Sequence, residues 1–535
     1  MSLIQEVKNR RTFAIISHPD AGKTTLTEKL LLYGGAIHLA GSVKARKTAK
    51  HAVSDWMEIE KQRGISVTSS VLQFDYDGCR VNILDTPGHQ DFSEDTYRTL
   101  MAADSAVMLI DVAKGVEAQT KKLFQVCKER GIPIFTFVNK IDHFGRNPFD
   151  LMEEIENLLG IRAYPMNWPI GINGEYQGIY DRETATVELF EKDTTHGQKK
   201  LASTKGSADD PEFQQLLGED IHQALIDDIE LLDVAGDEFD MEKVKSGQLT
   251  PMFFGSAMTN FGVKPFLEKF LELAPCPQPR AALEGVADPL SEDFTAFVFK
   301  IQANMNPQHH DRIVFMRICS GKFEKGMSVT HRQSGKTVRL SQPQQFLATE
   351  RTIIDEAYPG DIIGVFDPGT MGVGDTLYSG KAITFADFPV FPPELFARIR
   401  AKDTMKRKQF VKGMTQLAQE GAVQIFEQPH SGGESYIIGA VGQLQFEVLE
   451  YRLKNEYKVD LEITHLPYSV ARWVTQESAE PVDHTKLKGI DSAMVVKDNR
   501  DRIVLLISNE WQANWVVERN PDYTFLKTPS VISPE

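Results

Sequence analysis

The sequence predicts three successive folding units: an α/β domain, a small β-barrel and an α+β domain of the ferredoxin-like type. Short apolar strands alternate with helical stretches near the N-terminus, as in a parallel sheet with crossover helices. From about residue 294 to 383, short strands are separated by glycine turns, which is typical of a small barrel. Beyond about residue 391, the order strand-helix-strand-strand-helix-strand predicts a ferredoxin-like module. A chain of 535 residues is also too long for one compact core.

The first unit is predicted to span residues 1–279. Its expected strands are short and rich in Val, Ile, Leu and Phe, and they lie at 13–16, 81–84, 106–110, 134–138 and 252–254. Helices are expected at 24–32 and 263–273. Residues from about 165 to 250 are polar, and we interpret them as an insertion because the strand at 252–254 resumes the sheet. The proline-rich segment 274–279 predicts a stiff linker at the end of this unit.

The barrel is predicted for residues 280–390 and the α+β unit for residues 391–535. Barrel strands are expected at 294–301, 311–320, 328–331, 337–340 and 362–365. In the α+β unit, strands are expected at 394–400, 422–426, 434–441 and 459–463, and helices at 406–419 and 443–457. After these, the tail is predicted to hold a hairpin that turns at 498–501 and a short helix near Trp511.

Composition excludes several other classes of protein. The chain has 59 basic and 75 acidic residues, so it lacks the dominant positive field that nonspecific coating of nucleic acid requires. Its four cysteines form no Cys-x-x-Cys pair, which predicts free thiols in place of a zinc site or a disulfide framework. No apolar run approaches the ~18 residues of a membrane span, and no apolar leader is present. We therefore expect a cytoplasmic monomer with no membrane partner.

A phosphate-binding loop is predicted between the first strand and the first helix. Residues 17–24, the phosphate loop, read Ser-His-Pro-Asp-Ala-Gly-Lys-Thr, which fits the pattern except that Ser17 replaces the first glycine. Backbone N–H groups at a helix N-terminus can wrap phosphates, Lys23 would neutralise the β and γ phosphates, and Thr24 would give its hydroxyl to Mg²⁺. The predicted nucleotide-binding residues here are Ser17, His18, Pro19, Asp20, Ala21, Gly22, Lys23, Thr24 and Thr25.

A second loop, residues 85–89, reads Asp-Thr-Pro-Gly-His and follows the predicted strand 81–84. We call it the sensor loop. Asp85 at the strand end can hold Mg²⁺ through water, and the N–H of Gly88 can detect a γ-phosphate. His89 follows and is the candidate catalytic residue, because it is placed to orient the attacking water. Asp85, Thr86, Pro87 and Gly88 are predicted to line the nucleotide.

A third loop, residues 139–142, reads Asn-Lys-Ile-Asp and predicts guanine recognition. We call it the guanine loop. An aspartate accepts from both the ring N–H and the exocyclic amine of guanine, whereas adenine would leave the carboxylate unpaired. The motif lies at a strand's C-terminal end, where such sheets bind ligands. Asn139, Lys140 and Asp142 are therefore predicted to bind the base, and Ser256 and Ala257 would complete the base pocket through their backbone.

A flexible segment between the first two loops, 63–68, reads Arg-Gly-Ile-Ser-Val-Thr and is expected to close over the γ-phosphate. A hydroxyl there would reach Mg²⁺. Ser66 is the preferred ligand, and Thr68 is the alternative. The expected ligands of the site are therefore GTP or GDP and Mg²⁺.

The ordered set Asp-Ala-Gly-Lys-Thr, Arg-Gly-Ile-Ser, Asp-Thr-Pro-Gly-His and Asn-Lys-Ile-Asp resembles the translational GTPases of the elongation factor G and elongation factor Tu superfamily. Within that group, the runs at 17–28, 54–66 and 91–100 resemble the bacterial peptide chain release factor 3 family. This resemblance implies a ribosome-stimulated GTPase that promotes departure of stop-codon-reading release factors after peptide release. It also implies that His89 orients the water, and that the ribosome and these release factors, directly or indirectly, are partners.

Two alternatives remain open at this point. Elongation factor G, a translocase, shares the architecture but carries two further C-terminal domains, and the residues after about 463 are too few for both. A nucleotide-dependent scaffold that no longer hydrolyses GTP is disfavoured by the intact Lys23, Thr24, Asp85 and His89. On this acidic chain, an RNA-facing patch is expected at Arg398, Arg400, Lys402, Lys406, Arg407, Lys408 and Lys412, against the alternative of a solvated helix face.

Overall fold

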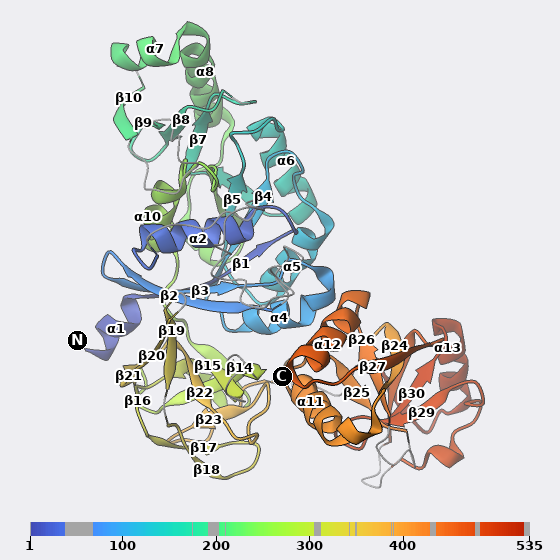
Figure 1. Ribbon diagram of the computed structural model, residues 1–535. Coiled ribbons are helices and arrows are strands. Elements are labelled where there is room, and N and C mark those ends of the chain that lie inside the picture. The colour runs from blue at the N-terminus through green and yellow to red at the C-terminus, as the bar shows by residue number, and fades with distance from the viewer. Residues whose placement is uncertain are drawn as a thin grey trace.

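The computed structural model confirms the predicted fold class: a GTPase-type α/β domain, a β-barrel-like domain and a C-terminal α+β domain follow one another along the chain (Figure 1). The structure describes residues 2–37, 68–173, 175–190, 203–208, 210–303, 312–341, 343–347, 350–386, 388, 390–428, 435–476 and 482–528. In this described part of the chain, no helix is both long enough and apolar enough to cross a bilayer.

A seven-stranded sheet in the order β2-β3-β1-β4-β5-β11-β6 forms the centre of the α/β domain. Its strands are β1 (Arg10–Ser17), β2 (Ser70–Tyr76), β3 (Cys79–Asp85), β4 (Ser105–Asp111), β5 (Ile134–Asn139), β6 (Arg162–Pro165) and β11 (Leu249–Phe254). All neighbours pair in parallel except β2, which is antiparallel to β3. This edge strand was not predicted. Its turn is Asp77-Gly78, and both residues have positive φ (46° and 75°), as a two-residue hairpin requires.

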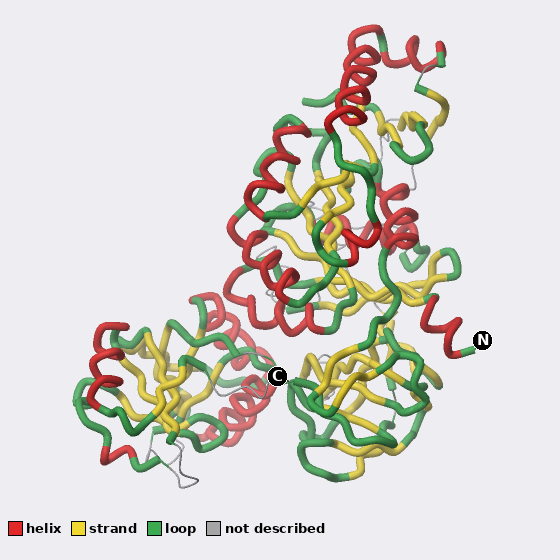
Figure 2. The backbone as a smooth tube through the Cα atoms, turned by 180° about the vertical axis from the view of Figure 1, so that it is seen from behind, coloured by secondary structure: helices red, strands yellow, loops and turns green. Residues whose placement is uncertain are grey.

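Helices cover both faces of this sheet (Figure 2). On one face, α2 (Lys23–Tyr33) and α10 (Val263–Leu273) bury apolar side chains against β1 and β5. On the other face lie α4 (Ser93–Met101), α5 (Ala118–Glu129) and α6 (Pro148–Leu159). A short helix, α1 (Leu3–Lys8), precedes β1. The two apolar layers hold the loops at the strand ends in fixed positions, which matters for the site below.

The predicted insertion folds as a subdomain of its own, although its sequence is polar. It contains a four-stranded sheet and three helices: β7 (Asn167–Ile170), β8 (Gly178–Asp181), β9 (Thr186–Phe190), β10 (Ser203–Ser207), α7 (Pro211–Leu217), α8 (Glu219–Ala235) and α9 (Met241–Lys245). Figure 1 shows β7–β10, α7 and α8 projecting from the α/β domain on the side away from the barrel. Its apolar residues, among them Trp168, Ile170 and Val187, belong to the same buried cluster as apolar residues of the α/β domain, and Trp168 packs against Phe149 of α6 and Phe254 of β11.

The barrel-like domain has more strands than the five expected. Its strands are β12 (Arg280–Ala282), β13 (Gly285–Ala287), β14 (Thr295–Ala303), β15 (Arg312–Ser320), β16 (Phe323–Glu324), β17 (Ser328–His331), β18 (Thr337–Arg339), β19 (Gln344–Leu347), β20 (Glu350–Ile353), β21 (Glu356–Ala357), β22 (Ile362–Phe366) and β23 (Thr376–Tyr378). Eight of them form one sheet in the order β18-β17-β23-β14-β15-β22-β19-β20. The strands that were missed are short, two to four residues, so they show no periodicity in the sequence.

The C-terminal domain begins with the predicted ferredoxin-like module. Its elements are β24 (Leu395–Ala401), the 3-10 turn η2 (Thr404–Lys406), α11 (Arg407–Gln419), β25 (Gln424–Phe426), β26 (Tyr436–Ala440), α12 (Gln443–Glu456) and β27 (Leu461–Leu466). The antiparallel order β25-β26-β24-β27 is the one this connectivity predicts.

The tail was predicted to hold only a hairpin and a helix, and this was incomplete. It adds a second four-stranded sheet, β29-β30-β28-β31, built from β28 (Val470–Thr475), β29 (Met494–Lys497), β30 (Ile503–Ile507) and β31 (Thr524–Leu526), with α13 (Glu510–Arg519) against it. A 3-10 turn, η3 (His484–Lys486), lies between β28 and β29.

Candidate nucleotide site

The three predicted loops meet at one edge of the central sheet. Register pairs Ile15 with Asp85, and Asp111 with Asn139, so β1, β3, β4 and β5 all end at this edge. Loops that follow the carboxyl ends of parallel strands are the usual place for a ligand in such sheets. The structure therefore brings the phosphate loop, the sensor loop and the guanine loop together, as their positions in the sequence predicted.

The phosphate loop is built around a glycine that no other residue could replace. Gly22 has φ of 96°, and a Cβ there would lie 2.4 Å from the side-chain nitrogen of Asn139. Gly22 is also the N-cap of α2 and offers no side chain to the N–H groups of the helix's first turn. Those donors are open to an anion, and the helix dipole favours one there. The local geometry thus fits a phosphate group.

Lys23 is buried at the start of α2, and its Nζ lies 2.5 Å from Oδ1 of Asp85 at the end of β3. Nearby, His18 Nε2 lies 3.2 Å from Oε1 of Glu117, while Ser17 Oγ and His18 Nδ1 are buried without a hydrogen-bond partner among the described residues. Unpaired buried polar atoms are costly. Their presence beside an ion pair in this loop marks a place where a polar ligand supplies the missing partners.

Two side-chain hydroxyl groups hold the sensor loop in place, and Gly88 of this loop touches the phosphate loop. Thr86 Oγ1 donates to the carbonyl of Ile15 at 2.7 Å, and Thr96 Oγ1 of α4 donates to the carbonyl of Pro87 at 3.2 Å. A Cβ on Gly88 would lie 3.4 Å from Cα of Pro19. Gly88 therefore lies against the phosphate loop, where its backbone can respond to whatever that loop binds.

His89 faces the short 3-10 turn η1 (Gln90–Phe92) that follows it. Its Nδ1 accepts from the backbone N–H of Asp91 at 3.2 Å, and the same nitrogen lies 3.3 Å from Oδ1 of Asp91. The first contact needs Nδ1 without a proton and the second needs Nδ1 with one, so Nδ1 faces Asp91 in either tautomer. The imidazole is about a third exposed (36%) and packs edge-on to Phe92. Sequence reasoning did not single out Asp91.

The guanine loop is held by a network of its own side chains. Asn139 donates from Nδ2 to the carbonyl of Ala21 at 2.8 Å and accepts at Oδ1 from the N–H of Ala257 at 2.9 Å. Lys140 donates to the carbonyl of Asp20 at 2.6 Å and pairs with Oδ2 of Asp111 at 2.7 Å. Asp111 was not predicted, although an acid at the end of a buried strand is a visible signal.

Asp142 has an unsatisfied carboxylate oxygen that suits a base. Its Oδ1 is buried and has no hydrogen-bond partner. Ser256, the other predicted side of the base pocket, donates its N–H to the carbonyl of Phe261 at 2.9 Å. Tyr176, from the insertion, is a buried neighbour that the sequence did not reveal. Burial, followed by the charges of Asp142 and Glu188, raises the pKa of its phenol well above the ordinary value, so the hydroxyl keeps its proton.

The candidate magnesium ligands come from three segments of the chain. Ser66 lies outside the described residues, and Thr68, which is half-buried, is the first residue described after that gap. Thr24 and Asp85 supply one hydroxyl and one carboxylate oxygen, a donor set that suits Mg²⁺. Among the residues that the structure describes, no cluster of three or more His, Cys, Asp or Glu side chains could hold a metal.

Comparison with known proteins decides the family. Residues 8–276 match the family model described as the Elongation factor Tu GTP binding domain, residues 293–380 match Elongation factor G domain 2, and residues 385–517 match the Class II release factor RF3, C-terminal domain. Peptide chain release factor 3 of Symbiobacterium thermophilum is 60% identical, over 98% of this chain and 99% of its own length. The chain belongs to the peptide chain release factor 3 family.

Other comparisons agree with this family. Peptide chain release factor 3 of Gloeobacter violaceus is 54% identical over 98% of both chains. A crystal structure of a protein from Thermus thermophilus has a TM-score of 0.68, covers 88% of this chain and 71% of its own, and is 23% identical, so it supports the fold alone. As a family member, this chain is a GTPase of translation termination that binds GTP and GDP, hydrolyses GTP and works with the ribosome. The resemblance carried by the motifs is confirmed.

Proposed function

We propose that the chain uses GTP on the ribosome to promote departure of the release factor that read the stop codon, after the peptide has been released. The observation that carries this proposal is the C-terminal domain. Residues 385–517 match a domain specific to this class of release factor, and helix α12 of that domain touches the turn that follows the sensor loop. A change at the γ-phosphate therefore has a short path to the part that distinguishes this family from a translocase.

In this proposal the phosphates lie on the N-terminus of α2. Lys23 exchanges part of its contact with Asp85 for the β and γ phosphates, and the N–H groups of the phosphate loop, residues 17–24, surround them. The unpaired Ser17 and His18 atoms support a polar ligand at this place. Mg²⁺, when bound, neutralises phosphate charge, and Thr24, Asp85 through water, and Ser66 or Thr68 would hold it.

The base lies against the guanine loop. Asp142 accepts from the two N–H groups that distinguish guanine from adenine, and its unpaired Oδ1 supports this role. Asn139 does not need to touch the base, because it already joins the phosphate loop to Ala257. Lys140 covers one side of the pocket, and the backbone of Ser256 and Ala257 closes it.

Hydrolysis in this proposal depends on position. Gly88, against Pro19, senses the γ-phosphate through its N–H, and His89 orients the water that attacks phosphorus. Of the segment 63–68, which is expected to close over the γ-phosphate, only Thr68 lies within the described residues. Loss of phosphate then releases Gly88 and the turn after it.

The test is displacement of a fluorescent stop-codon-reading factor from ribosomes that have already released their peptide, followed in single-round and multiple-round conditions beside a translocation assay. We expect GTP-dependent displacement over many rounds and no movement of transfer RNA. Displacement that is absent, together with movement of transfer RNA, would assign the chain to translocation.

A further inference from the structure

Asp91 connects two regions that are far apart in the sequence. Its Oδ2 accepts from the backbone N–H of Leu444 in the first turn of α12, at 2.8 Å. Its Oδ1 lies 3.3 Å from Nδ1 of His89. The residue is only 7% exposed. A single carboxylate is therefore shared between the candidate catalytic histidine and the C-terminal domain.

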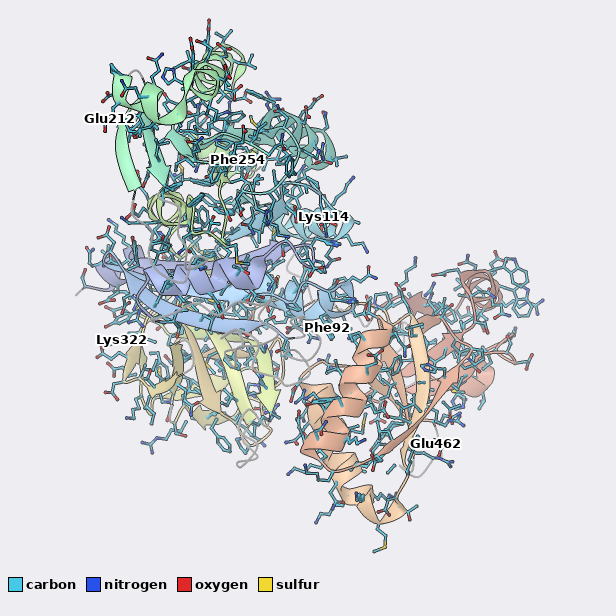
Figure 3. The ribbon with its side chains drawn as sticks, turned by 45° about the horizontal axis from the view of Figure 1, so that its top comes forward. Phe92, Lys114, Glu212, Phe254, Lys322 and Glu462 are labelled. Atoms are coloured by element: carbon cyan, nitrogen blue, oxygen red, sulfur yellow. The ribbon has the colours of Figure 1, made fainter. Side chains whose placement is uncertain are left out.

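The α12 side of this contact requires a glycine. A Cβ on Gly442, the residue before α12, would lie 2.0 Å from Cγ of Asp91. Its φ of −147° is open to any residue, so the requirement comes from the approach of Asp91 and not from backbone strain. Phe92 and Val448 form an apolar contact beside it, and Arg98 of α4 donates to the carbonyl of Glu420 at 3.4 Å. Figure 3 shows Phe92 on the side of the α/β domain that faces the C-terminal helices.

We propose that Asp91 is a positioning residue for His89, and that docking of α12 holds Asp91 in place. The inference rests on the role proposed for His89. It adds a requirement for hydrolysis: the C-terminal domain must be seated on the turn after the sensor loop for the imidazole to be held.

Imidazole has two ring nitrogens, so a contact between Asp91 and one of them is enough to orient the ring of His89. With Nδ1 turned to Asp91, the opposite nitrogen, Nε2, is the one left for the substrate water, and no partner of Nε2 is seen in the described part of the chain. When Nδ1 carries no proton it accepts from the Asp91 N–H, and Nε2–H can donate to the water. When Nδ1 carries the proton it donates to Oδ1 of Asp91, and in the neutral ring Nε2 can then accept from the water. A carboxylate that fixes an imidazole through its second nitrogen is a general device for orienting a catalytic group.

Docking matters because the carboxylate has few other anchors. The N–H of Leu444 holds Oδ2, which leaves Oδ1 directed at the ring. Without that donor, the carboxylate can rotate, and the ring loses a fixed partner. Small misplacement of a catalytic group lowers the rate by about 10- to 100-fold.

The experiment perturbs the contact from the side that is remote from the nucleotide. Gly442→Ala introduces the clash with Asp91, Asp91→Asn keeps an acceptor oxygen but removes the charge, and Gln443→Ala changes the exposed neighbouring residue of α12 as a matched control. Ribosome-stimulated GTP hydrolysis is measured in single turnover at saturating ribosomes, and GTP and GDP affinities are measured without ribosomes. We expect Gly442→Ala and Asp91→Asn to lower the rate about 10- to 100-fold at unchanged nucleotide affinity, and Gln443→Ala to match the unaltered chain.

A double-variant cycle separates positioning from general damage. In a His89→Ala background, Gly442→Ala should have no further effect, because its consequence passes through His89. An equal fold-loss in both backgrounds, or normal hydrolysis by Gly442→Ala and Asp91→Asn, overturns the inference and leaves His89's own role intact. Normal hydrolysis by His89→Ala instead removes the proposed role of His89, and the two failures are thereby distinguishable.

Discussion

The candidate nucleotide pocket has a base side, formed by the guanine loop, and a phosphate side, formed by the phosphate and sensor loops. The two sides differ in how many of their polar groups already have hydrogen-bond or ion-pair partners within the protein. On the base side, both side-chain atoms of Asn139 are bonded, and Lys140 is fixed by Asp20 and Asp111. In the described part of the chain, Asp142 keeps a buried carboxylate oxygen without a hydrogen-bond partner, and the hydroxyl of Tyr176 is likewise buried without one. On the phosphate side, Lys23 and Asp85 neutralise each other, and both need new partners when phosphate arrives.

This difference suits two separate tasks, the selection of the base and the detection of the γ-phosphate. A side whose hydrogen bonds are already formed selects its ligand with few groups, and its structure changes little when the ligand leaves. A side whose charges must exchange partners changes shape with the ligand, and such loops carry a signal to other domains. The sensor loop belongs to the second kind, because Gly88 adjoins the phosphate loop and Asp91 adjoins α12.

The largest effect is expected on the base side. Asp142→Asn replaces an acceptor with a group that also donates, which suits the carbonyl of xanthine where guanine has its amine. We expect the preference for GTP over xanthosine triphosphate to fall about 10⁴-fold. Competition binding measures the ratio, with Asp150→Asn on the exposed face of α6 as the control. An unchanged ratio would mean that base selection lies elsewhere in the assembled side.

On the phosphate side, Lys23→Ala leaves the buried Asp85 carboxylate without its cation, facing the phosphates. Breaking a buried pair in this way costs about 3–5 kcal/mol, and we expect GTP affinity to weaken by about two to three and a half orders of magnitude. Calorimetry with Lys121→Ala, an exposed lysine of α5, as control gives the measurement. GTP binding at full affinity would show that the phosphate side does not need Lys23 to bind the phosphates.

His89→Ala should leave nucleotide binding unchanged and lower the rate of GTP hydrolysis. Among the described residues, the imidazole contacts η1 and not the groups proposed to hold the nucleotide, so GTP affinity should stay the same. Ribosome-stimulated hydrolysis should fall at least about 10²-fold. Rapid-quench measurement of phosphate release, paired with equilibrium binding of GTP, tests both statements on one preparation. A variant that hydrolyses at full rate would take His89 out of the reaction.

The placement of the three loops was predictable from local pattern, while the roles of their residues at a nucleotide stay predictions. Lys23, Asp85 and Asn139 lie in short motifs whose loops follow buried strands, and their meeting point followed from the topology of a parallel sheet. The ferredoxin-like module was also predictable, because its strands and helices alternate in an order with one common sheet arrangement. These features are local in the chain, so one sequence contains them.

The features that were missed depend on contacts between distant segments. Strand β28 lies between β30 and β31, which come later in the chain, so the second C-terminal sheet has no local signature. Asp91 looks like any surface acid in the sequence, and its meaning comes from α12, more than 350 residues away. The need for a glycine at position 442 is likewise not visible in the sequence, because it comes from the contact with Asp91.

The predicted basic patch is smaller in the structure than in the sequence. Arg400 is paired with Glu462, and Lys406 donates to the carbonyl of Lys458. Arg398 is half-buried and donates to Gln428. Lys402, Arg407, Lys408 and Lys412 are exposed. Lys408 and Lys412 are four residues apart on α11 and share one face of it.

The smallest effect is expected from this patch, and it sharpens the comparison because it should leave both sides of the pocket unchanged. Reversing Lys402, Lys408 and Lys412 to Glu should weaken ribosome binding and reduce its salt dependence, since each lysine that meets an RNA phosphate contributes about one unit to the slope of log K against log salt. Nucleotide affinity should stay the same, because these residues lie on the C-terminal domain. Reversal of Lys121, Lys122 and Lys128 on α5 changes the net charge equally and serves as the control. Identical salt slopes for the two triple variants would show that the lysines of α11 form a solvated helix face, and that the acidic chain meets the ribosome through other groups.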